Sequence, residues 1–513
     1  MSVEIVLALL AVMLALTAIA HKIGIPYPIL LVLGGLAISL VPGLPAIVLD
    51  PNTVFVLFLP PIIQLSAYYT PTRDFRRYWN SIGMLAVGLV LASMLAVAVV
   101  AHQIIPGMPW AAAFALGAIV APPDAVAASS IARRLRLPRN IVTVLEGESL
   151  LNDATALVAY RTAVMATVTG IFSFWEAGGQ FLLASLGGVV VGLVVCVVIV
   201  PVFRRLTTHI PVYLALTFIS GFGAYLIADT LHVSGVLAVI TLGILYNQPR
   251  FNTMTSELRI QGTAVWEIVV FLLNGLIFIL IGLQLRSVVE RLPGESLAPA
   301  LGYAALICLT LIVVRLAWMY PGAYISWRFS RRHLQMPPPP WQQVTIVGWT
   351  GMRGIVSLAS ALALPLAIGG GAQFPQRDLI VFLTFCVILV TLVLQGLSLP
   401  LLIRWLRVED DGSGEREKHK ARMKVALTAQ HRLHELVETG QIPVEFAQKL
   451  KHHYASRVRL HSARHEGRED KAQEELTAQF AQLQQDLITV ELEALIRLRN
   501  QGVINDEVLR EVQ

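Results

Sequence analysis

Long apolar stretches alternate with short polar or charged segments over the first 408 residues of the chain. A helix needs about 20 apolar residues to cross a bilayer, and division of the sequence at charges, prolines and glycines leaves thirteen candidate spans, several of them short or interrupted. Their approximate limits are 2–21, 26–41, 51–70, 79–105, 110–132, 140–168, 178–203, 211–229, 232–247, 262–285, 298–327, 341–366 and 378–403. Because the runs are continuous rather than alternating, they predict membrane helices and exclude a barrel.

The distribution of charge separates this apolar region from a polar tail. The 513 residues are 56% hydrophobic and 14% charged, whereas about a quarter of the residues in an ordinary soluble domain are charged. Residues 1–408 contain 23 Lys/Arg and 14 Asp/Glu, and the much shorter segment 409–513 contains 16 and 19. We therefore predict a transmembrane domain at 1–408 and a helical cytoplasmic domain at 409–513.

Cysteines and basic residues exclude two other classes of protein. Cys196, Cys308 and Cys386 lie singly within apolar runs, without the spacing of a disulfide framework or a zinc site. The basic residues occupy short loops rather than one face, so the net charge of +6 is no sign of nucleic-acid binding.

Loop charges predict the orientation of the chain in the membrane. Thirteen spans place the two ends on opposite sides, and the side with more Lys and Arg in its loops is cytoplasmic. One set of loops carries fifteen such residues and the other carries three. The tail lies on the side of the fifteen, so we expect the N-terminus outside and the C-terminus in the cytoplasm.

The tail begins with a polar, glycine-containing linker at 409–415, followed by charged amphipathic stretches at 416–439 and 469–499. Leucines in the second stretch recur at roughly helical spacing. Two interpretations stay open. The tail packs on itself or on a second copy, or it is a regulatory sensor.

Eight charged residues lie inside the apolar spans, where each costs about 2.5–3.5 kcal/mol on insertion scales. Such residues are usually paired, exposed to water or functional. For a residue at the end of a span, a water-facing position is as good an explanation as function. The eight are Asp124, Glu148, Asp153, Arg161, Asp229, Glu267, Arg315 and Arg353, of which Asp229 lies at a span end.

The fifth span is interrupted by Pro122 and Pro123 immediately before Asp124. Two successive prolines remove backbone donors and clash with the preceding turn, so this segment is predicted to unwind near the middle of the membrane. Unwound carbonyl groups beside a carboxylate form a candidate cation site. A proline kink with a structural aspartate is the alternative.

The sixth span places four oxygen-bearing side chains on two adjacent rows of one helix face. The rows are Glu148 with Asn152 and Ser149 with Asp153. Asp153 lies about 21 Å along a helix from the start of the span, too deep to reach the surface. Together with Asp124 these oxygens suit a hard monovalent cation. Polar residues that hold helices together are the alternative.

Carboxylates held in this environment favour their protonated forms, because desolvation and mutual repulsion oppose ionisation. A proton and a cation would then compete for the same oxygens. Such a site exchanges one cargo for the other without ATP or a redox cofactor. The sequence has no phosphate-binding glycine loop and no nucleophile triad, so we expect neither an enzyme nor a bound cofactor.

The twelfth span is interrupted by Gly351 and Gly354, which flank Arg353. If spans 1–6 and 8–13 are inverted repeats joined by span 7, this interruption has the same place in its repeat as the two prolines have in theirs. Paired interruptions of this kind are typical of the central site of a transporter. Arg353 would offset carbonyl dipoles or carboxylate charge there.

Arg315 in the eleventh span needs an acidic partner, and we pair it with Glu148. For Arg315 and for Arg353 alike, a purely structural ion pair is the preferred role. The predicted fold is an all-α polytopic membrane protein. It has about 13 transmembrane helices in two six-helix inverted repeats, broken crossing helices at spans 5 and 12, and a helical cytoplasmic tail.

These motifs resemble the bacterial branch of the monovalent cation:proton antiporter family, the relatives of the sodium/proton exchangers. The Gly-Glu-Ser-Leu-Leu-Asn-Asp string combined with the upstream aspartate is the most specific part of the match. The matching segments, in family order, are Leu59-Pro-Pro-Ile-Ile63, Pro123-Asp124-Ala-Val-Ala127, Gly147-Glu-Ser-Leu-Leu-Asn-Asp153, His232-Val-Ser-Gly-Val-Leu-Ala238 and Gly351-Met-Arg-Gly354.

The resemblance implies a homodimer in a bacterial inner membrane, in which a core domain carries the ion past a fixed dimerisation domain. It also implies roles for single residues. An Asn-Asp pair such as Asn152-Asp153 is similar to that of electroneutral members, which implies one cation for one proton. Carried over by position, Asp153 is the principal carboxylate for cation and proton, Asp124, Ser149 and Asn152 are its neighbours in the ion site, Glu148 and Arg315 are a structural pair, and Arg353 lies by the crossing of the broken helices.

The chain departs from the family pattern at two places. Many exchangers have an acidic residue shortly after Leu-Pro-Pro, where this chain has Gln64-Leu65-Ser66. The family commonly has Asp followed by Pro, where this chain has Pro123 followed by Asp124. The second departure changes the backbone that is available as an ion ligand.

The leading hypothesis is a secondary antiporter that exchanges Na+ for H+, with K+ or Li+ as the other possible cations. A cation channel also uses carboxylates inside the membrane, but no carbonyl filter of the Thr-Val-Gly-Tyr-Gly type is visible. A third hypothesis is a K+/H+ antiporter whose tail regulates transport. The expected partners are a second copy and membrane lipid, not nucleic acid, and the sequence does not identify a partner of the tail.

Overall fold

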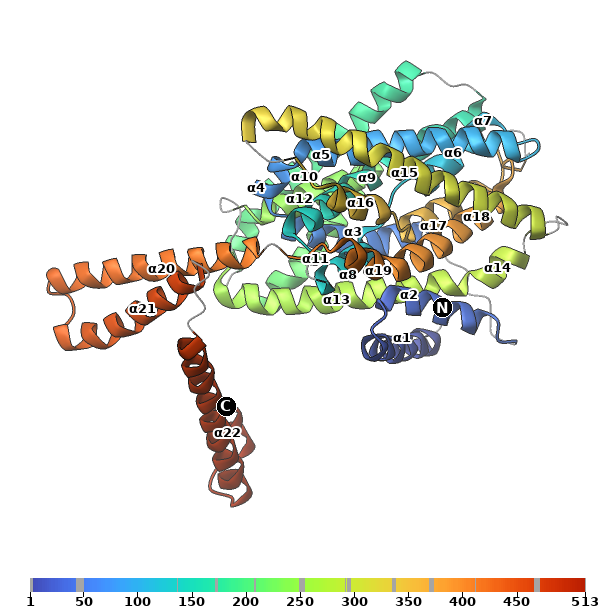
Figure 1. Ribbon diagram of the computed structural model, residues 1–513. Coiled ribbons are helices and arrows are strands. Elements are labelled where there is room, and N and C mark those ends of the chain that lie inside the picture. Colours follow the sequence, from blue (N-terminus) through green and yellow to red (C-terminus); the bar gives the residue numbers. More distant parts are fainter. Residues whose placement is uncertain are drawn as a thin grey trace. The chain divides into compact units, whose positions relative to one another are not determined.

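The computed structural model describes residues 3–42, 50–135, 137–170, 174–206, 209–248, 254–290, 292, 297–334, 338–368, 373–410, 412–465 and 471–512 (Figure 1). The chain divides into two compact units, Met1–Glu409 and Asp410–Gln513. The first unit contains the apolar helices, and the second contains the charged helices of the tail.

The regular elements of the first unit, within the described ranges, are helices. Each candidate span coincides largely with one helix or with a run of consecutive helices. In chain order the helices are α1 (Val3–Ile23), α2 (Tyr27–Ser39), α3 (Pro51–Tyr69), α4 (Thr72–Arg77), α5 (Trp79–Gly83), the π-helical η1 (Met84–Leu89), α6 (Val90–Ile104), α7 (Trp110–Val120), α8 (Ala125–Arg134), α9 (Arg139–Thr169), α10 (Phe174–Arg205), α11 (Ile210–Thr230), α12 (Gly235–Tyr246), α13 (Ser256–Leu283), α14 (Leu285–Glu290), α15 (Leu297–Leu334), α16 (Trp341–Trp349), α17 (Ile355–Leu362), α18 (Arg377–Val390), the π-helical η2 (Thr391–Gln395) and α19 (Gly396–Leu406).

Seven helical stretches within the described residues are long and apolar enough to cross a membrane, and further apolar helices, including α7 and α12, are shorter. Helix α9 has 31 residues but carries several charged side chains. The chain is therefore an all-helical multi-span membrane protein. The count of thirteen crossings stays a prediction.

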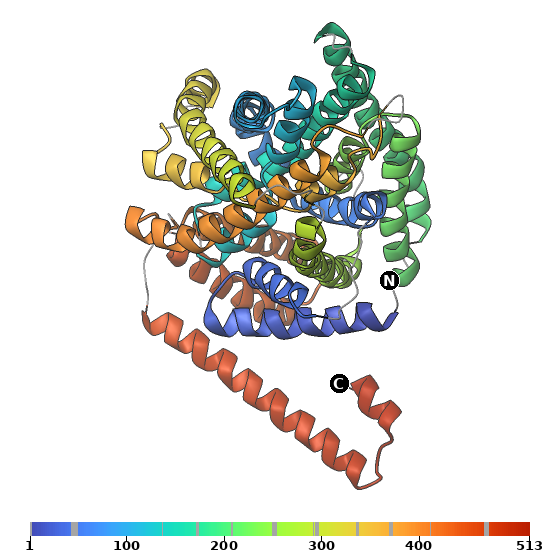
Figure 2. The same ribbon diagram turned by 90° about the vertical axis from the view of Figure 1, so that its right-hand side faces the viewer.

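Large apolar side chains project from the peripheral helices. Helix α1 lies at the outside of the first unit against α2 and α13 (Figures 1 and 2). Helix α10 exposes Leu183, Leu186 and Val198 at helical spacing. Apolar side chains exposed on this scale suit a lipid environment, because lipid tails are as apolar as leucine.

The fifth and twelfth predicted spans are both interrupted by non-helical backbone. Residues 121–124 separate α7 from α8, and residues 350–354 separate α16 from α17. The two interruptions contact one another, because the Asp124 N–H donates to the Met352 carbonyl oxygen at 2.6 Å. A Cβ atom on Gly354 would lie 1.7 Å from Asp124 Oδ2. Glycine is therefore needed for this close approach.

The second unit consists of α20 (Ser413–Glu438), α21 (Val444–His465), α22 (Lys471–Asn500) and α23 (Asp506–Val512). Helices α20 and α21 lie side by side (Figure 1), and the turn between them contains Gly440 with a φ of +68°. The predicted helices at 416–439 and 469–499 correspond to α20 and α22, except that residues 469–470 lie outside the described residues. Helix α21 was not predicted from the sequence.

Helices α2 and α13 approach each other closely through glycines. A Cβ atom on Gly35 would lie 2.3 Å from the Ile279 carbonyl oxygen, and one on Gly282 would lie 2.2 Å from the Val32 carbonyl oxygen. Small residues allow membrane helices to pack backbone against backbone. This packing fixes the position of α13, whose residues also line the cavity described below.

We predict that Gly282→Ala destabilises the first unit, because the added methyl group forces α13 away from α2. Overpacking of this kind costs about 1–3 kcal/mol. Gly302→Ala on α15 is the matched control, since no described atom lies within 4 Å of the corresponding Cβ position. The melting temperatures of the purified proteins in detergent measure the effect. A Gly282→Ala protein as stable as the Gly302→Ala protein would contradict the close packing.

Candidate functional site

A cavity of about 380 Å³ lies beside the two interruptions. Its walls are formed by residues of α3, α8, α9, α13 and α17 and by the backbone that leads into α8. The lining combines apolar side chains with many polar and charged ones. Those that matter for the site are Asp124, Ser149, Asp153, Glu267, Asn274 and Ser357.

Asp124 lies at the end of the first interruption and caps α8. Its Oδ1 accepts a hydrogen bond from the Val126 N–H at 2.8 Å, which satisfies one of the free backbone donors at the start of the helix. The same helix end favours negative charge because of the helix dipole. The start of α8 thus holds the Asp124 side chain in place where it lines the cavity.

Asp153 and Ser149 supply the wall formed by α9. They are one helical turn apart, so both side chains project from the same face, and both line the cavity. Asp153 and Asp124 thus reach one cavity from different helices. Carboxylate and hydroxyl oxygens are the ligand types that alkali cations use.

Glu148 and Asn152 form the neighbouring row of α9 and are turned into the protein interior. Glu148 makes two hydrogen bonds with the Arg315 guanidinium, at 2.6 and 2.9 Å, and both side chains are 1% exposed. Asn152 is fully buried, and its Nδ2 donates to the Pro123 carbonyl oxygen at 2.9 Å. Asn152 is not among the residues that line the cavity.

Arg353 holds carbonyl groups at both interruptions. Its Nε donates to the Val120 carbonyl oxygen at 3.0 Å, where α7 ends, and its Nη1 donates to the Gly351 carbonyl oxygen. Its backbone N–H donates to Thr391 Oγ1 at 3.1 Å. The guanidinium therefore compensates the negative ends of the helix dipoles at the crossing. The structural ion pair predicted for Arg353 is not found among the described residues, because its guanidinium donates to carbonyl groups instead of a carboxylate.

The cavity reaches the surface at an ion pair between α8 and α9. Arg133 and Glu146 both line it, their side chains are 67% and 25% exposed, and Arg133 Nη2 lies 2.7 Å from Glu146 Oε1. Glu267 on α13 also lines the cavity and is exposed. Glu267 is one of the eight charged residues inside the apolar spans, and the sequence predicts no role for it.

The other pair of charges inside the spans lies away from this cavity. Arg161 and Asp229 form an ion pair at 2.9 Å, with side chains 54% and 49% exposed. This position agrees with the water-facing explanation for Asp229. Exposed pairs of this kind contribute little to stability, and neither residue lines the cavity.

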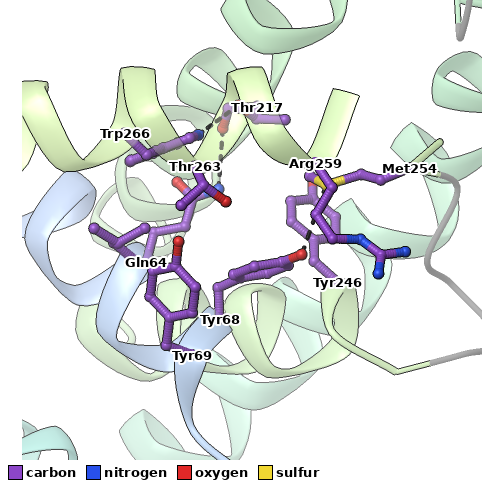
Figure 3. A pocket seen from close by; sticks show the side chains of 11 residues that line it. Gln64, Tyr68, Tyr69, Thr217, Tyr246, Met254, Arg259, Thr263 and Trp266 are labelled. Carbon is purple, nitrogen blue, oxygen red and sulfur yellow. Dashed lines mark hydrogen bonds between the residues drawn. The ribbon is translucent and has the colours of Figure 1, made fainter. Parts of the chain in front are cut away.

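Gln64 belongs to a second, much smaller cavity of about 30 Å³ between α3, α11 and α13 (Figure 3). Its Nε2 donates to the Thr217 carbonyl oxygen at 3.0 Å, and Trp266 Nε1 donates to Thr217 Oγ1 at 3.1 Å. Leu65 and Tyr69 line both cavities. Gln64, in the segment after Leu-Pro-Pro, is therefore a neutral side chain that joins α3 to α11. Trp266 joins α13 to the same threonine.

Three comparisons relate the chain to known proteins. A family model described as "Sodium/hydrogen exchanger, transmembrane" matches residues 6–405. The chain is 32% identical to the sodium, potassium, lithium and rubidium/H+ antiporter of Bacillus subtilis, over 100% of this chain and 77% of that protein. It is 33% identical to the Na+/H+ antiporter NhaP of Pseudomonas aeruginosa, over 68% of this chain and 79% of that protein.

A solved structure has a similar fold. The sodium proton antiporter MjNhaP1 of Methanocaldococcus jannaschii at pH 8 superposes with a TM-score of 0.59 and 17% sequence identity. The superposition covers 79% of this chain and 98% of that protein. The identity is low, so this likeness concerns the fold alone.

We predict that the buried Glu148–Arg315 pair tolerates joint replacement better than single replacement. Arg315→Met alone leaves an unpaired buried carboxylate, which costs about 3–5 kcal/mol, whereas an apolar pair of similar volume is often neutral. The double variant Glu148→Leu/Arg315→Met should therefore melt at a higher temperature than either single variant. A double variant whose destabilisation equals the sum of the two single effects would show that the charges are not coupled.

Proposed function

The chain belongs to the sodium/hydrogen exchanger family and is a monovalent cation/proton antiporter, and from this premise we propose that it exchanges Na+ for H+ across a bacterial cytoplasmic membrane, one for one. The observation that carries the proposal is the position of Asp124 and Asp153 on the wall of one cavity. Carboxylates bind either a proton or a cation, so occupation by one cargo excludes the other.

Each polar residue of the site has a separate part in this proposal. Asp153 is the principal carboxylate, because it projects from a continuous helix into the cavity. Asp124 is the second, fixed by the start of α8, and Ser149 adds a neutral oxygen one turn from Asp153. The unwound backbone before α8 brings these groups together, in the way that interrupted helices form the central sites of transporters.

Alternating access is supported by the same geometry. The cavity opens at the Arg133–Glu146 pair, which lies in the part of the chain assigned to the cytoplasmic side by the charges of the loops. We propose that this arrangement is the inward-facing state. In the family picture, a homodimer supplies the fixed scaffold against which the domain that contains α7–α8, α9 and α16–α17 moves.

The range of cations is the second part of the proposal. The Bacillus subtilis relative is named as an antiporter of sodium, potassium, lithium and rubidium, which favours a site that accepts several alkali cations. The carboxyl and hydroxyl oxygens that line the cavity are hard ligands, which suit each of these cations. We therefore propose Na+ as the principal cargo, with K+ and Li+ as further substrates.

We predict that the purified protein in proteoliposomes collapses an imposed pH gradient when Na+ is added, and that Asp153→Asn abolishes this exchange. The amide cannot carry the negative charge that the cation needs. Asp378→Asn is the matched control, because Asp378 lies in the first turn of α18 and does not line the cavity. Full exchange by the Asp153→Asn protein would refute the assignment of the site. Unitary currents in a planar bilayer would identify a channel instead.

We also predict that the exchange rate does not depend on membrane potential. One-for-one exchange moves no net charge, whereas moving one elementary charge across 100 mV is worth about 2.3 kcal/mol. Initial rates of Na+-driven proton movement, measured with potentials of either sign set by gradients of the permeant anion thiocyanate, should be equal. A rate that rises with potential of one sign would show that more than one proton moves per cation.

A further inference from the structure

Ser357 is a buried hydroxyl group that faces the candidate ion site from the second interrupted helix. It is 1% exposed, it lies in the first turn of α17, and it lines the same cavity as Asp124 and Asp153. Its Oγ has no hydrogen-bond partner among the described residues. Leaving a buried hydroxyl unpaired is unfavourable, so this atom needs an explanation.

Two buried threonines show how a hydroxyl group in a helix can be satisfied by the preceding turn. Thr384 Oγ1 donates to the Ile380 carbonyl oxygen at 2.8 Å, and Thr391 Oγ1 donates to that of Val387 at 2.7 Å. Ser357 makes no such bond in the described structure. Among the described side chains with a buried unpaired polar atom, Ser357 is the one that lines this cavity.

The contact between Gly354 and Asp124 places Ser357 close to the carboxylates. A Cβ on Gly354 would meet the Asp124 side chain, and residues three apart on a helix lie on one face, about 5–6 Å from each other. Ser357 is therefore one turn further along the face that contacts Asp124. Its hydroxyl and the two carboxylates approach the cavity from three different helical segments.

We propose that Ser357 Oγ is a ligand of the transported cation, supplied by the second interrupted helix to the site formed by Asp124, Asp153 and Ser149. This inference rests on the proposed exchange function. A hydroxyl oxygen is a suitable ligand for an alkali cation. The serine hydroxyl group does not ionise in the physiological pH range. Ser357 thus contributes to the binding of one cargo and not of the other, unlike the two carboxylates, which bind both.

The consequence is a separation of cation affinity from proton affinity. Loss of the Ser357 hydroxyl removes one neutral ligand, which corresponds to about a three- to tenfold increase in the half-saturating Na+ concentration. The maximum rate and its pH dependence at saturating Na+ should remain as in the wild type, because the proton-binding carboxylates are unchanged. A residue with only a packing role would not produce this combination.

The test compares four variants in proteoliposomes, with Na+ as the probe. Ser357→Ala and Ser357→Cys should both raise the half-saturating Na+ concentration, since sulfur is a soft and therefore poor ligand for a hard cation. Ser357→Thr, which keeps an oxygen, should stay near the wild type. Ser360→Ala is the matched control, because Ser360 is 3% exposed on the same helix and does not line the cavity.

Each outcome separates the inference from the function on which it rests. A wild-type protein that does not exchange Na+ for H+ would overturn the proposed function itself. Normal exchange with an unchanged half-saturating concentration in both Ser357→Ala and Ser357→Cys would overturn only the role of Ser357. Equal increases in Ser357→Ala and Ser360→Ala would do so as well, since they would indicate packing of α17. If Ser357→Ala does not fold, the Ser357→Cys and Ser357→Thr proteins decide the question by the same comparison.

Discussion

The structure depends on satisfying backbone polar groups that interrupted helices leave free inside a membrane. Water cannot pair with them there, so each free donor or acceptor needs a partner within the protein. The chain supplies these partners at the crossing: Asp124 N–H donates to the Met352 carbonyl, Arg353 donates to the Val120 carbonyl, and Asn152 donates to the Pro123 carbonyl. These hydrogen bonds hold the two interruptions in fixed positions. Side chains that take no part in them, such as Asp153 and Ser149, line the cavity.

Helix periodicity divides α9 into a structural row and a cargo row. Ser149 and Asp153 line the cavity, whereas Glu148 and Asn152 are buried and engaged by Arg315 and the Pro123 carbonyl. The ion pair with Arg315 engages both carboxylate oxygens of Glu148, so they are not available to a cation. Two carboxylates five residues apart on one helix therefore have opposite roles because of their directions, not their chemistry.

The sequence predicts much of this arrangement, and the reasons for its failures are physical. Proline and glycine interrupt helices by local sterics, so both broken segments were visible, and burial of Glu148 and Arg315 made a pairing the natural inference. Ser357 went unnoticed because a lone serine in an apolar span is common, and its significance depends on the contact between Gly354 and Asp124. Helix α21 is no less apolar than α20 and was missed because its packing against α20 is a contact between segments that the sequence pattern does not show.

The placement of Asn152 bears on the charge that the site carries. An asparagine amide donates to the Pro123 carbonyl, and an ionised aspartate at this position would present oxygen to oxygen, which is repulsive. The neutral amide of Asn152 therefore maintains the hydrogen bond to the Pro123 carbonyl oxygen, which helps to hold the first interruption in place. Asn152 carries no charge and Glu148 is paired with Arg315, so neither adds a free carboxylate to the cavity. Among the described residues, the carboxylates that line it are Glu146, which is paired with Arg133, and Asp124, Asp153 and Glu267. The proposed exchange of a single cation for a single proton rests on this neutral residue, because Asn152 adds no carboxylate to the cavity beside Asp153.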